Sequence, residues 1–571
     1  MTSTYDTLSS RLQSAFDTLE VGADPVLRTS DRSDYQANGV MALAKRLGRS
    51  PRDVAEEIVG RADLTDVADV EIAGPGFLNL TLRPAFLADQ LTGLRGDDRL
   101  GIEVASKAKT VVIDYSAPNV AKEMHVGNLR STVIGDALAR MNRFAGHHVI
   151  ARNHVGDWGT PFAMLIEHLL DREEGDDASF SIGDLDGFYR DARTKFDADE
   201  TFKERSRARV VALQSGDPET LRLWRVIVDQ SVAYLDLVYQ DLGISLTIDD
   251  VVGESFYDFM LGDVVADLSA AGLIVESGGA LCVFPPGFTN RDGEALPLIV
   301  RKSDEGFGYA ASDLAAVRDR VDNLHADEML YVVGVPQAQH FEMVFAVARM
   351  AGWLPDRVRC EHVTFGNVLG PDRKMFKSRS GETVKLASLL GEAIERADAA
   401  LKERNTDLDE MARTRLAVEI ARAAIKYADL STDRHHDYIF DLDRMIAFEG
   451  DTGPYLQYAH ARLRSIFRRL GAPWASPTVA FALDTPQERH LALGLLAFPE
   501  AFESSLASLQ PHRLCVYLFD LAQRLTAFYD ACPVLSSEGA LRDQRLALCD
   551  LAARTLSIGL SVLGIDAPEK M

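Results

Sequence analysis

The spacing of hydrophobic and polar positions changes several times along the chain. The first region combines helical periodicity with short strand-like runs, such as Asp69–Ile72 and Phe77–Leu82. Its opening residues are acidic and amphipathic, which indicates a helix and not a signal peptide. The polar stretch Arg95–Arg99 follows. We therefore predict a small α+β domain over residues 1–100, ending in a linker.

A strand–helix–strand pattern follows this linker. The β-branched run Thr110–Tyr115 leads into a polar loop, and apolar residues then recur at helical spacing over Gly127–Phe144. Gly146 ends this helix, and the run HHVIAR starts a second strand. This order predicts a βαβ unit of a parallel sheet.

Further strand patterns alternate with helical ones, so we expect the same sheet to continue. These patterns are Leu281–Phe284, Leu298–Arg301, Leu330–Gly334 and Arg359–Phe365. A charged helical segment at about 170–245 interrupts the alternation. We interpret it as an insertion whose helices mainly form a solvated surface.

Strand patterns fade after Val384, and helical patterns rich in Ala, Leu and Arg run to the end of the chain. The predicted fold class is α/β: a parallel-sheet domain, an N-terminal α+β domain and a C-terminal all-α helical bundle. We place the sheet domain at residues 108–385, a helical linker at 386–450 and the bundle at 451–571.

Composition narrows the possible partners. With 571 residues, 47% of them hydrophobic, the chain has material for several cores. Its formal net charge of −25 disfavours non-specific binding to DNA or an anionic membrane. Five cysteines form no CxxC pair, so we predict neither a disulfide framework nor a metal site. No apolar run is long enough to span a bilayer, so we expect a cytoplasmic protein.

The loop after the first strand of the βαβ unit carries the strongest candidate chemistry. His125, Gly127 and Asn128 fall where a helix begins, and the N–H groups and dipole of that terminus attract phosphate. Gly127 lacks a Cβ, so a nucleotide can approach the backbone. His125 and Asn128 can donate hydrogen bonds to developing charge. The pattern His-x-Gly at His125–Gly127 is by itself weak evidence for a nucleotide site, because it occurs again at His154–Gly156.

The stretch DYSAPNVAKEMHVGNLRSTVIGD (Asp114–Asp136) closely resembles the signature region of arginyl-tRNA synthetases, a class I family whose Rossmann-like core activates an amino acid with ATP. The resemblance continues in family order through NHVGDWGTPF (Asn153–Phe162), RKSDEGFGYAASDLA (Arg301–Ala315), VVGVPQAQHF (Val332–Phe341), FKSRSGETVKL (Phe376–Leu386) and GDTGPYLQYAHAR (Gly450–Arg462). It implies an arginine–tRNA ligase that binds L-arginine, ATP and tRNA(Arg). It also implies Mg²⁺ held mainly by the ATP phosphates, a monomer, and activation only after tRNA has bound.

The resemblance places His125 and Asn128 at the two polar positions of the family's HIGH-type motif, with Asn128 where histidine is commoner. The second family motif, the KMSKS-like loop, matches Met375–Gly381 with Ser380 at its second lysine. Lys122 is then placed to supply the missing charge, with Lys377 and Arg379 as secondary candidates. A solvent-exposed lysine is the alternative for Lys122. The implied ATP-binding set is His125, Gly127, Asn128, Phe376, Lys377 and Arg379.

Arginine specificity requires a carboxylate, because a guanidinium is planar, always charged and binds bidentately. Asp313 resembles the family's guanidinium-binding aspartate, and Tyr309 lies four residues earlier on the same helical face. An exposed pair or a helix cap is the alternative from spacing alone. The resemblance adds Gln337, Asp114 and Asn119 as arginine-binding residues. His340 either lines the same pocket or is a core histidine.

Two regions are candidates for tRNA binding. The segment AHARLRSIFRRL is basic, and the family places its anticodon-binding domain here; we assign Tyr458, Arg462 and Arg464 to tRNA. A solvated helix face is compatible with that role. The N-terminal module resembles one that meets the tRNA elbow through Phe77 and Asn79, although Phe77 fits a buried strand equally well.

Three other functions fit parts of the sequence. A synthetase for another amino acid is disfavoured by the missing zinc ligands and by the lack of room for an editing insertion. A small nucleotidylyltransferase would not need the helical C-terminal third. A non-catalytic tRNA-binding paralogue is the main alternative, although it would be expected to lose Lys122, Asp313 or Gln337.

Overall fold

The computed structural model describes residues 3–30, 32–173, 185–303, 306–376, 384–404, 408–470, 474 and 479–571. The chain consists of two compact units. One comprises Met1–Val104, Phe448–Ser561 and Asp566–Met571, and the other comprises Ala105–Ala447 and Val562–Ile565.

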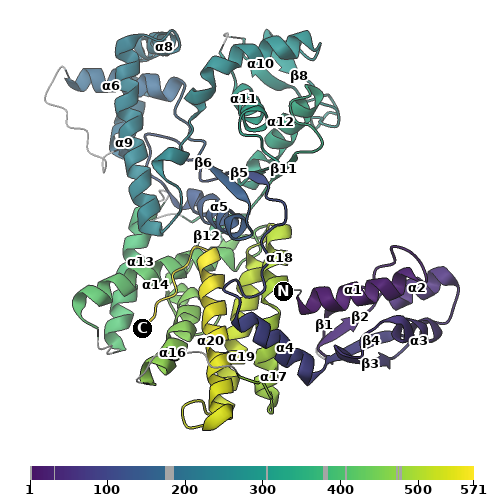
Figure 1. The fold of residues 1–571 in the computed structure, drawn as a ribbon. Coiled ribbons are helices and arrows are strands. Elements are labelled where there is room, and N and C mark those ends of the chain that lie inside the picture. Colours follow the sequence, from purple (N-terminus) through teal and green to yellow (C-terminus); the bar gives the residue numbers. More distant parts are fainter. Residues whose placement is uncertain are drawn as a thin grey trace. The chain divides into compact units, whose positions relative to one another are not determined.

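The second unit is built on a parallel sheet. Its strands are β5 (Thr110–Asp114), β6 (His148–Arg152), β10 (Glu328–Tyr331) and β11 (Arg359–His362), in the order β11-β10-β5-β6. Helix α5 (Val126–Phe144) connects β5 to β6, and α12 (Ala338–Met350) connects β10 to β11. These crossovers leave the sheet centre in opposite directions, so right-handed connections put the two helices on opposite faces (Figure 1). The strand order therefore changes direction between β5 and β10, where α/β sheets bind ligands.

The βαβ unit forms as its sequence predicts. Val111, Val112 and Ile113 are buried in β5, as expected for a strand covered on both faces. Helix α5 approaches this strand closely at Gly135, where a Cβ atom would lie 2.2 Å from the Cβ of Tyr115. On the other face, Leu314 and Val344 belong to a core shared by α11 (Tyr309–Asp322), β10 and α12.

One expectation about the sheet is wrong. The patterns at Leu281–Phe284 and Leu298–Arg301 form β8 (Ala280–Val283) and β9 (Leu298–Arg301), which pair antiparallel in a separate sheet with β7 (Val275–Ser277). The reason lies in the turn before β8, where Gly278 and Gly279 both have positive φ, 60° and 79°. Two such residues make a tight hairpin, which joins antiparallel strands.

The predicted insertion is helical, but its interpretation as mainly solvated surface is wrong for one face. Its helices are α6 (Thr160–Glu173), α7 (Leu185–Ala198), α8 (Glu200–Gln214) and α9 (Pro218–Leu242). Leu223, Ser231 and Tyr239 on α9 are buried, and two of them contact the loop that follows β5.

The remaining elements of the second unit surround the sheet. They are η2 (Ile248–Asp250), η3 (Glu254–Tyr257), α10 (Asp258–Ala270), η4 (Val335–Gln337), β12 (Val368–Leu369), α13 (Leu386–Glu403), α14 (Glu410–Leu430), β13 (Tyr438–Ile439) and α15 (Leu442–Met445). Strands β12 and β13 pair parallel, which places a short strand within the region predicted as purely helical.

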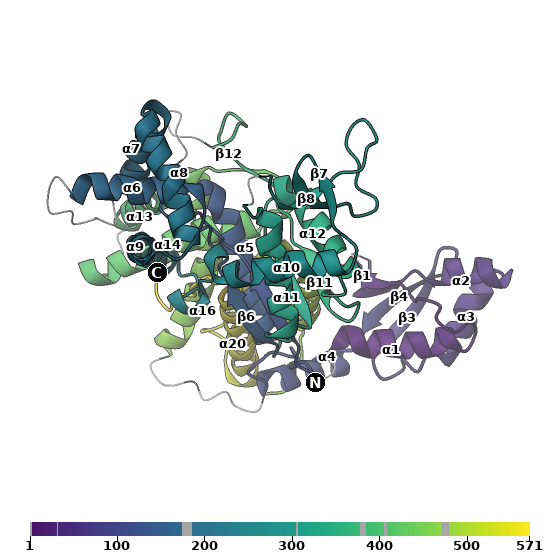
Figure 2. The same cartoon turned by 90° about the horizontal axis from the view of Figure 1, so that it is seen from above.

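The first unit combines an antiparallel sheet with helices from both ends of the chain. Its N-terminal elements are α1 (Thr4–Asp17), β1 (Leu27–Thr29), β2 (Tyr35–Ala37), α2 (Val40–Leu47), α3 (Pro51–Arg61), β3 (Ala68–Ala73), β4 (Phe77–Leu82) and α4 (Pro84–Arg95). The sheet order is β1-β2-β4-β3, and α1 runs beside it (Figure 2). The predicted α+β pattern is thus confirmed.

Helices make up the C-terminal part of this unit. They are α16 (Gly453–Arg469), α17 (Pro486–Leu496), α18 (Phe498–Ala507), α19 (His512–Ala531) and α20 (Gly539–Val562). Within the described ranges, no helix is both long and apolar enough to cross a membrane.

Candidate active site

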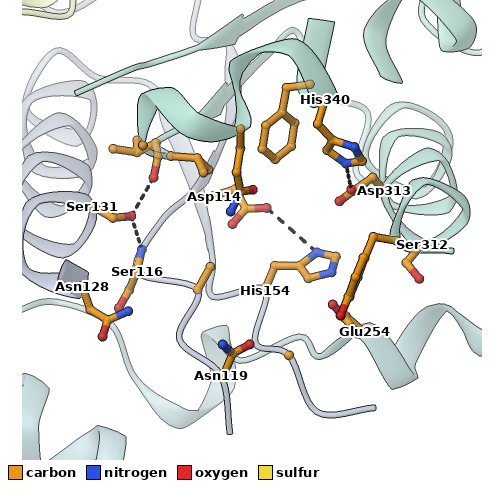
Figure 3. A pocket seen from close by; sticks show the side chains of 18 of the residues that line it. Asp114, Ser116, Asn119, Asn128, Ser131, His154, Glu254, Ser312, Asp313 and His340 are labelled. Carbon is orange, nitrogen blue, oxygen red and sulfur yellow. Dashed lines mark hydrogen bonds and ion pairs between the residues drawn. The ribbon is translucent and has the colours of Figure 1, made fainter. Parts of the chain in front are cut away.

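A cavity of about 480 Å³ opens at the carboxyl ends of β5, β6 and β10 (Figure 3). Asp114 and Ser116 from the end of β5 and His154 after β6 line it, together with Gly334 after β10. Side chains from η3, α11 and α12 complete the wall. The cavity therefore lies at the switch point of the sheet.

A second cavity of about 440 Å³ adjoins the first. The two share Gly127, Gly334, Gln337 and Phe365 in their walls. The second is further lined by His125, Arg130, Val368, Met375 and Phe376. The first turn of α5 thus lies between two spaces, each large enough for a small-molecule ligand.

His125 is the N-cap of α5, and the hydrogen bond of its ring determines which ring nitrogen carries the proton. Its ring Nδ1 accepts a hydrogen bond from the backbone N–H of Gly127 at 3.0 Å. A neutral ring whose Nδ1 accepts must carry its proton on Nε2. Burial lowers the pKa of His125 below 6.5, so this neutral form is favoured. His125 is therefore a neutral donor at the helix N-terminus.

Asn128 and Gly127 complete this cap. The Oδ1 atom of Asn128 accepts from the backbone N–H of His125 at 3.1 Å, which leaves its amide N–H groups as donors. A Cβ atom on Gly127 would lie 2.8 Å from Cε1 of His125. Any larger residue at this position would thus displace the His125 ring from its present place.

The loop before α5 holds three non-glycine residues in the left-handed region. Ser116, Ala117 and Ala121 have φ values of 71°, 43° and 63°. Such conformations persist only where surrounding contacts enforce them. Here the N–H of Ala117 donates to Asn153 Oδ1 at 3.0 Å, and the N–H of Ala121 donates to Ser231 Oγ at 3.1 Å.

The predicted arginine-binding pair lies in the first cavity. Tyr309 and Asp313 both project from α11 into its lining, and the Tyr309 side chain is exposed. Asp313 Oδ2 lies 2.6 Å from Nε2 of His340, which lines the same cavity (Figure 3). The structure therefore favours the interpretation that His340 lines the pocket over the alternative that it is a core residue.

Glu254 is a cavity-lining carboxyl group that the sequence analysis did not identify. It belongs to η3 and lines the first cavity, as Ser312 of α11 also does (Figure 3). Burial and the carboxylates of Asp313 and Asp157 raise its pKa to about 8. The repulsion between two carboxyl groups in one cavity favours the protonated form of one of them, and a bound cation would relieve it. No local motif marks Glu254, because it meets Asp313 only through the tertiary fold.

The other predicted arginine-binding residues also line the first cavity. Asp114 is buried and paired with the guanidinium of Arg320 at 2.6 Å, while His154 Nδ1 lies 4.0 Å from the same carboxylate. Asn119 lies exposed at the edge. Gln337, at the end of η4, lines both cavities.

Only some of the residues predicted to bind ATP lie within the described ranges. Phe376 lines the second cavity and stacks on Phe440, with 5.1 Å between the ring centroids. Lys377 and Arg379, with Ser380 of the same loop, lie outside the described residues. Lys122 lies in neither cavity wall. Its Nζ lies 4.2 Å from the centroid of the Tyr189 ring.

The predicted tRNA-binding residues of the bundle lie on α16. Tyr458 and Arg462 line a small pocket against α19, and the Arg462 guanidinium lies 4.0 Å from the centroid of the Tyr529 ring. Arg464 Nε instead lies 2.8 Å from the carboxylate of Glu569. The basic segment itself contains no acidic residue, but Glu569, close to the C-terminus, neutralises one of its arginines.

The N-terminal candidates differ in accessibility. Phe77 is half-buried and lines a groove of the first unit together with Arg28 and Gln36. Asn79 is buried, and its Oδ1 accepts from Nε2 of Gln36 at 2.7 Å. Asn79 thus orients Gln36, which does reach the groove.

Family models match the chain in three segments. Residues 5–82 match the arginyl tRNA synthetase N terminal domain, 91–442 match the class I (R) tRNA synthetase catalytic domain, and 456–571 match the DALR anticodon binding domain.

Relatives match over nearly the whole chain. The arginine–tRNA ligases of Thermobifida fusca and Frankia casuarinae are 53% and 50% identical, covering 99% and 96% of this chain and 98% and 95% of theirs. The solved arginyl-tRNA synthetase of Plasmodium falciparum is 28% identical with a TM-score of 0.85, covering all of both chains. That of Thermus thermophilus is 27% identical with a TM-score of 0.84, covering 99% of each. The chain therefore belongs to the arginyl-tRNA synthetases, the class I enzymes that ligate arginine to tRNA.

Proposed function

We propose that the first cavity binds L-arginine and the second binds ATP, so that their reacting groups meet at the N-terminus of α5. The observation that supports this most strongly is that the carboxyl groups of Asp313 and Glu254 line one cavity, beside the phosphate-attracting helix terminus. A guanidinium satisfies both carboxyl groups, with Tyr309 and Gln337 at the rim. His340 holds the Asp313 carboxylate in place.

Activation then requires positioning and charge stabilisation, not a protein nucleophile. A carboxylate oxygen of arginine attacks the α-phosphorus of ATP in line; the new O–P bond forms as the bond to pyrophosphate breaks. His125 Nε2–H and the Asn128 amide donate to the charge on the α-phosphate. The terminal ribose hydroxyl of tRNA next attacks the carbonyl of the mixed anhydride and releases AMP.

The leaving pyrophosphate needs a cation that the second motif lacks at Ser380. We assign this charge to Lys122, with Lys377 as the other candidate, and expect Mg²⁺ to enter with ATP, held mainly by its phosphates. Lys122 lies three residues before His125, which supports the assignment. Burial has the largest effect on the pKa of His125 and lowers it, and the nearby Lys122 ammonium also lowers it.

We assign the tRNA contacts to both ends of the chain. Phe77 serves the tRNA elbow, with Asn79 acting there by orienting Gln36, and Tyr458, Arg462 and Arg464 serve the anticodon region, in a monomeric cytoplasmic enzyme. The proposed division is residues 1–100 for the elbow, 108–385 for catalysis, 386–450 for the tRNA stem and 451–571 for the anticodon. The stacking of Arg462 on Tyr529 supports a surface suited to unstacked bases.

Pyrophosphate exchange into ATP tests this function. Each standard amino acid is supplied in turn, with and without total tRNA. We expect exchange with arginine only, and only when tRNA is present. Exchange with another amino acid would overturn the assignment of the first cavity, and exchange without tRNA would overturn the coupled mechanism. Tight tRNA binding with no exchange at all would favour the non-catalytic alternative.

A further inference from the structure

Helix α7 of the insertion contacts the loop that carries Lys122. The Nζ atom of Lys122 lies over the face of the half-buried Tyr189 ring, 4.2 Å from its centroid. An ammonium in this position is attracted by the ring quadrupole. The lysine side chain is thus held by an aromatic group that belongs to neither cavity wall.

The same face of α7 also holds the backbone next to Lys122. Asp186 lies three residues before Tyr189, so both side chains project from one side of the helix. Asp186 Oδ1 accepts a hydrogen bond from the backbone N–H of Glu123 at 2.9 Å. One helical turn therefore fixes both the side chain of Lys122 and the peptide that follows it.

Lys385 ties this contact to the chain just after the second family motif. Its Nζ lies 3.0 Å from Glu123 Oε1 and 3.4 Å from Asp186 Oδ2. Two backbone bonds reinforce the link: Val126 N–H to Val384 O and Leu386 N–H to Met124 O, both 2.9 Å. The loop before His125 is consequently clamped between α7 and the segment around Lys385.

We propose that Tyr189 is a positioning residue for amino-acid activation, which restricts the Lys122 ammonium to one place three residues before His125, while Asp186 fixes the adjoining backbone. This inference rests on the proposed function and assigns a task to the insertion. Without the ring, the flexible four-carbon stem of Lys122 would occupy several rotamers, and the charge would be in place for a smaller share of the time.

Arginine-dependent pyrophosphate exchange in the presence of tRNA tests the proposal through matched variants. Tyr189→Leu removes the π face and should lower kcat about fivefold while KM for arginine stays unchanged. Tyr189→Phe keeps the face and should retain wild-type kcat. Phe196→Leu is the control, because Phe196 lies on the same helix and stacks with Arg193, outside the Lys122 contact.

A double variant separates positioning from a merely structural role. In a Lys122→Met background, Tyr189→Leu should cause no further loss of kcat, because the charge that it positions is already gone. An equal loss in both backgrounds, or a wild-type kcat for Tyr189→Leu, would overturn the proposal. If Tyr189→Leu lowers the melting temperature, Tyr189→Met replaces it as a longer, more adaptable side chain without a ring. Absence of exchange in the wild-type enzyme would refute the proposed function instead.

Discussion

At the scale of single residues, Asn128 explains how the signature loop departs from the commoner histidine without losing its geometry. Its Oδ1 caps the N–H of His125, and its amide still offers donors toward the phosphate site. The position therefore contributes hydrogen bonds and no titratable charge. Any pH response of the α5 terminus must come from His125 itself.

The titration of His125 can be measured directly. Burial lowers its pKa below 6.5, Asp186 raises it and Lys122 lowers it. Protonation would remove the Nδ1 lone pair that accepts from Gly127, so exchange should slow as the pH falls through this lowered pKa. NMR titration should show the midpoint below 6.5, moving up in Lys122→Met and down in Asp186→Asn. A midpoint above 6.5 in the wild-type protein would contradict this assignment.

Glu254 predicts proton release when arginine binds. Its pKa of about 8 means that the carboxyl group is mostly protonated at pH 7 in the ligand-free enzyme. A guanidinium beside it favours the ionised form and lowers this pKa, so close to one proton should leave on binding. Calorimetry of the tRNA-bound enzyme in buffers of different ionisation enthalpy measures that number. Glu254→Gln should abolish the release, and an unchanged value in this variant would exclude Glu254 as its source.

The sequence made Asp313 predictable and left Glu254 hidden. Asp313 and Tyr309 lie on one helix, where spacing alone brings their side chains together, and a family motif surrounds them. Glu254 reaches the same cavity from η3, a short turn after Gly253. Contacts between residues distant in sequence leave no periodic trace, so only the folded chain reveals this carboxyl group.

At the scale of elements, the packing of α5 on β5 depends on Gly135. A Cβ there would meet the side chain of Tyr115 at 2.2–2.5 Å. Gly135→Ala should therefore lower the free energy of unfolding by about 1–3 kcal/mol, through overpacking. Gly391→Ala on α13 is the matched control, because a Cβ there meets no atom within 4 Å. Thermal denaturation of both variants checks the difference; equal stability would show that the interface adapts freely.

Helices and strands were predicted correctly where the hydrophobic periodicity and the order of the elements along the chain indicate the same structure. The run Thr110–Tyr115 and the helix after it were predictable, because a buried parallel strand and its crossover helix each have a distinct period. The patterns at β8 and β9 predicted two strands but not the strands with which they pair. A run of four residues does not show which sheet it joins. The buried face of α9 was likewise hidden by the charges on its exposed side.

At the scale of the whole molecule, the first unit joins segments from opposite ends of the chain. Arg489 of α17 pairs with Asp34 and also donates to the backbone O of Leu82 at 2.9 Å. Composition and periodicity gave no indication of this association, because each segment forms its own elements from local patterns. The predicted four-part division therefore did not anticipate which parts share a unit.

Charge at this scale predicts how tRNA binding responds to salt. The chain carries a net charge of −25, so association must depend on a few local cations. Arg462 stacks on Tyr529, whereas Arg464 is already paired with Glu569. Arg462→Ala should reduce the slope of log affinity against log salt by about 0.7–0.9, and Arg464→Ala by less. Binding titrations over a range of KCl concentrations test this order, which equal slopes for the two variants would contradict.

The left-handed backbone at Ser116, Ala117 and Ala121 has a consequence for laboratory evolution. Glycine adopts such φ values without steric cost, so Ala121→Gly should raise the free energy of unfolding by up to about 1 kcal/mol. A library screened only for heat resistance should then enrich glycine in this loop. Screened instead for the rate of aminoacylation, the same library should keep alanine, because a looser loop holds Lys122 and His125 less firmly.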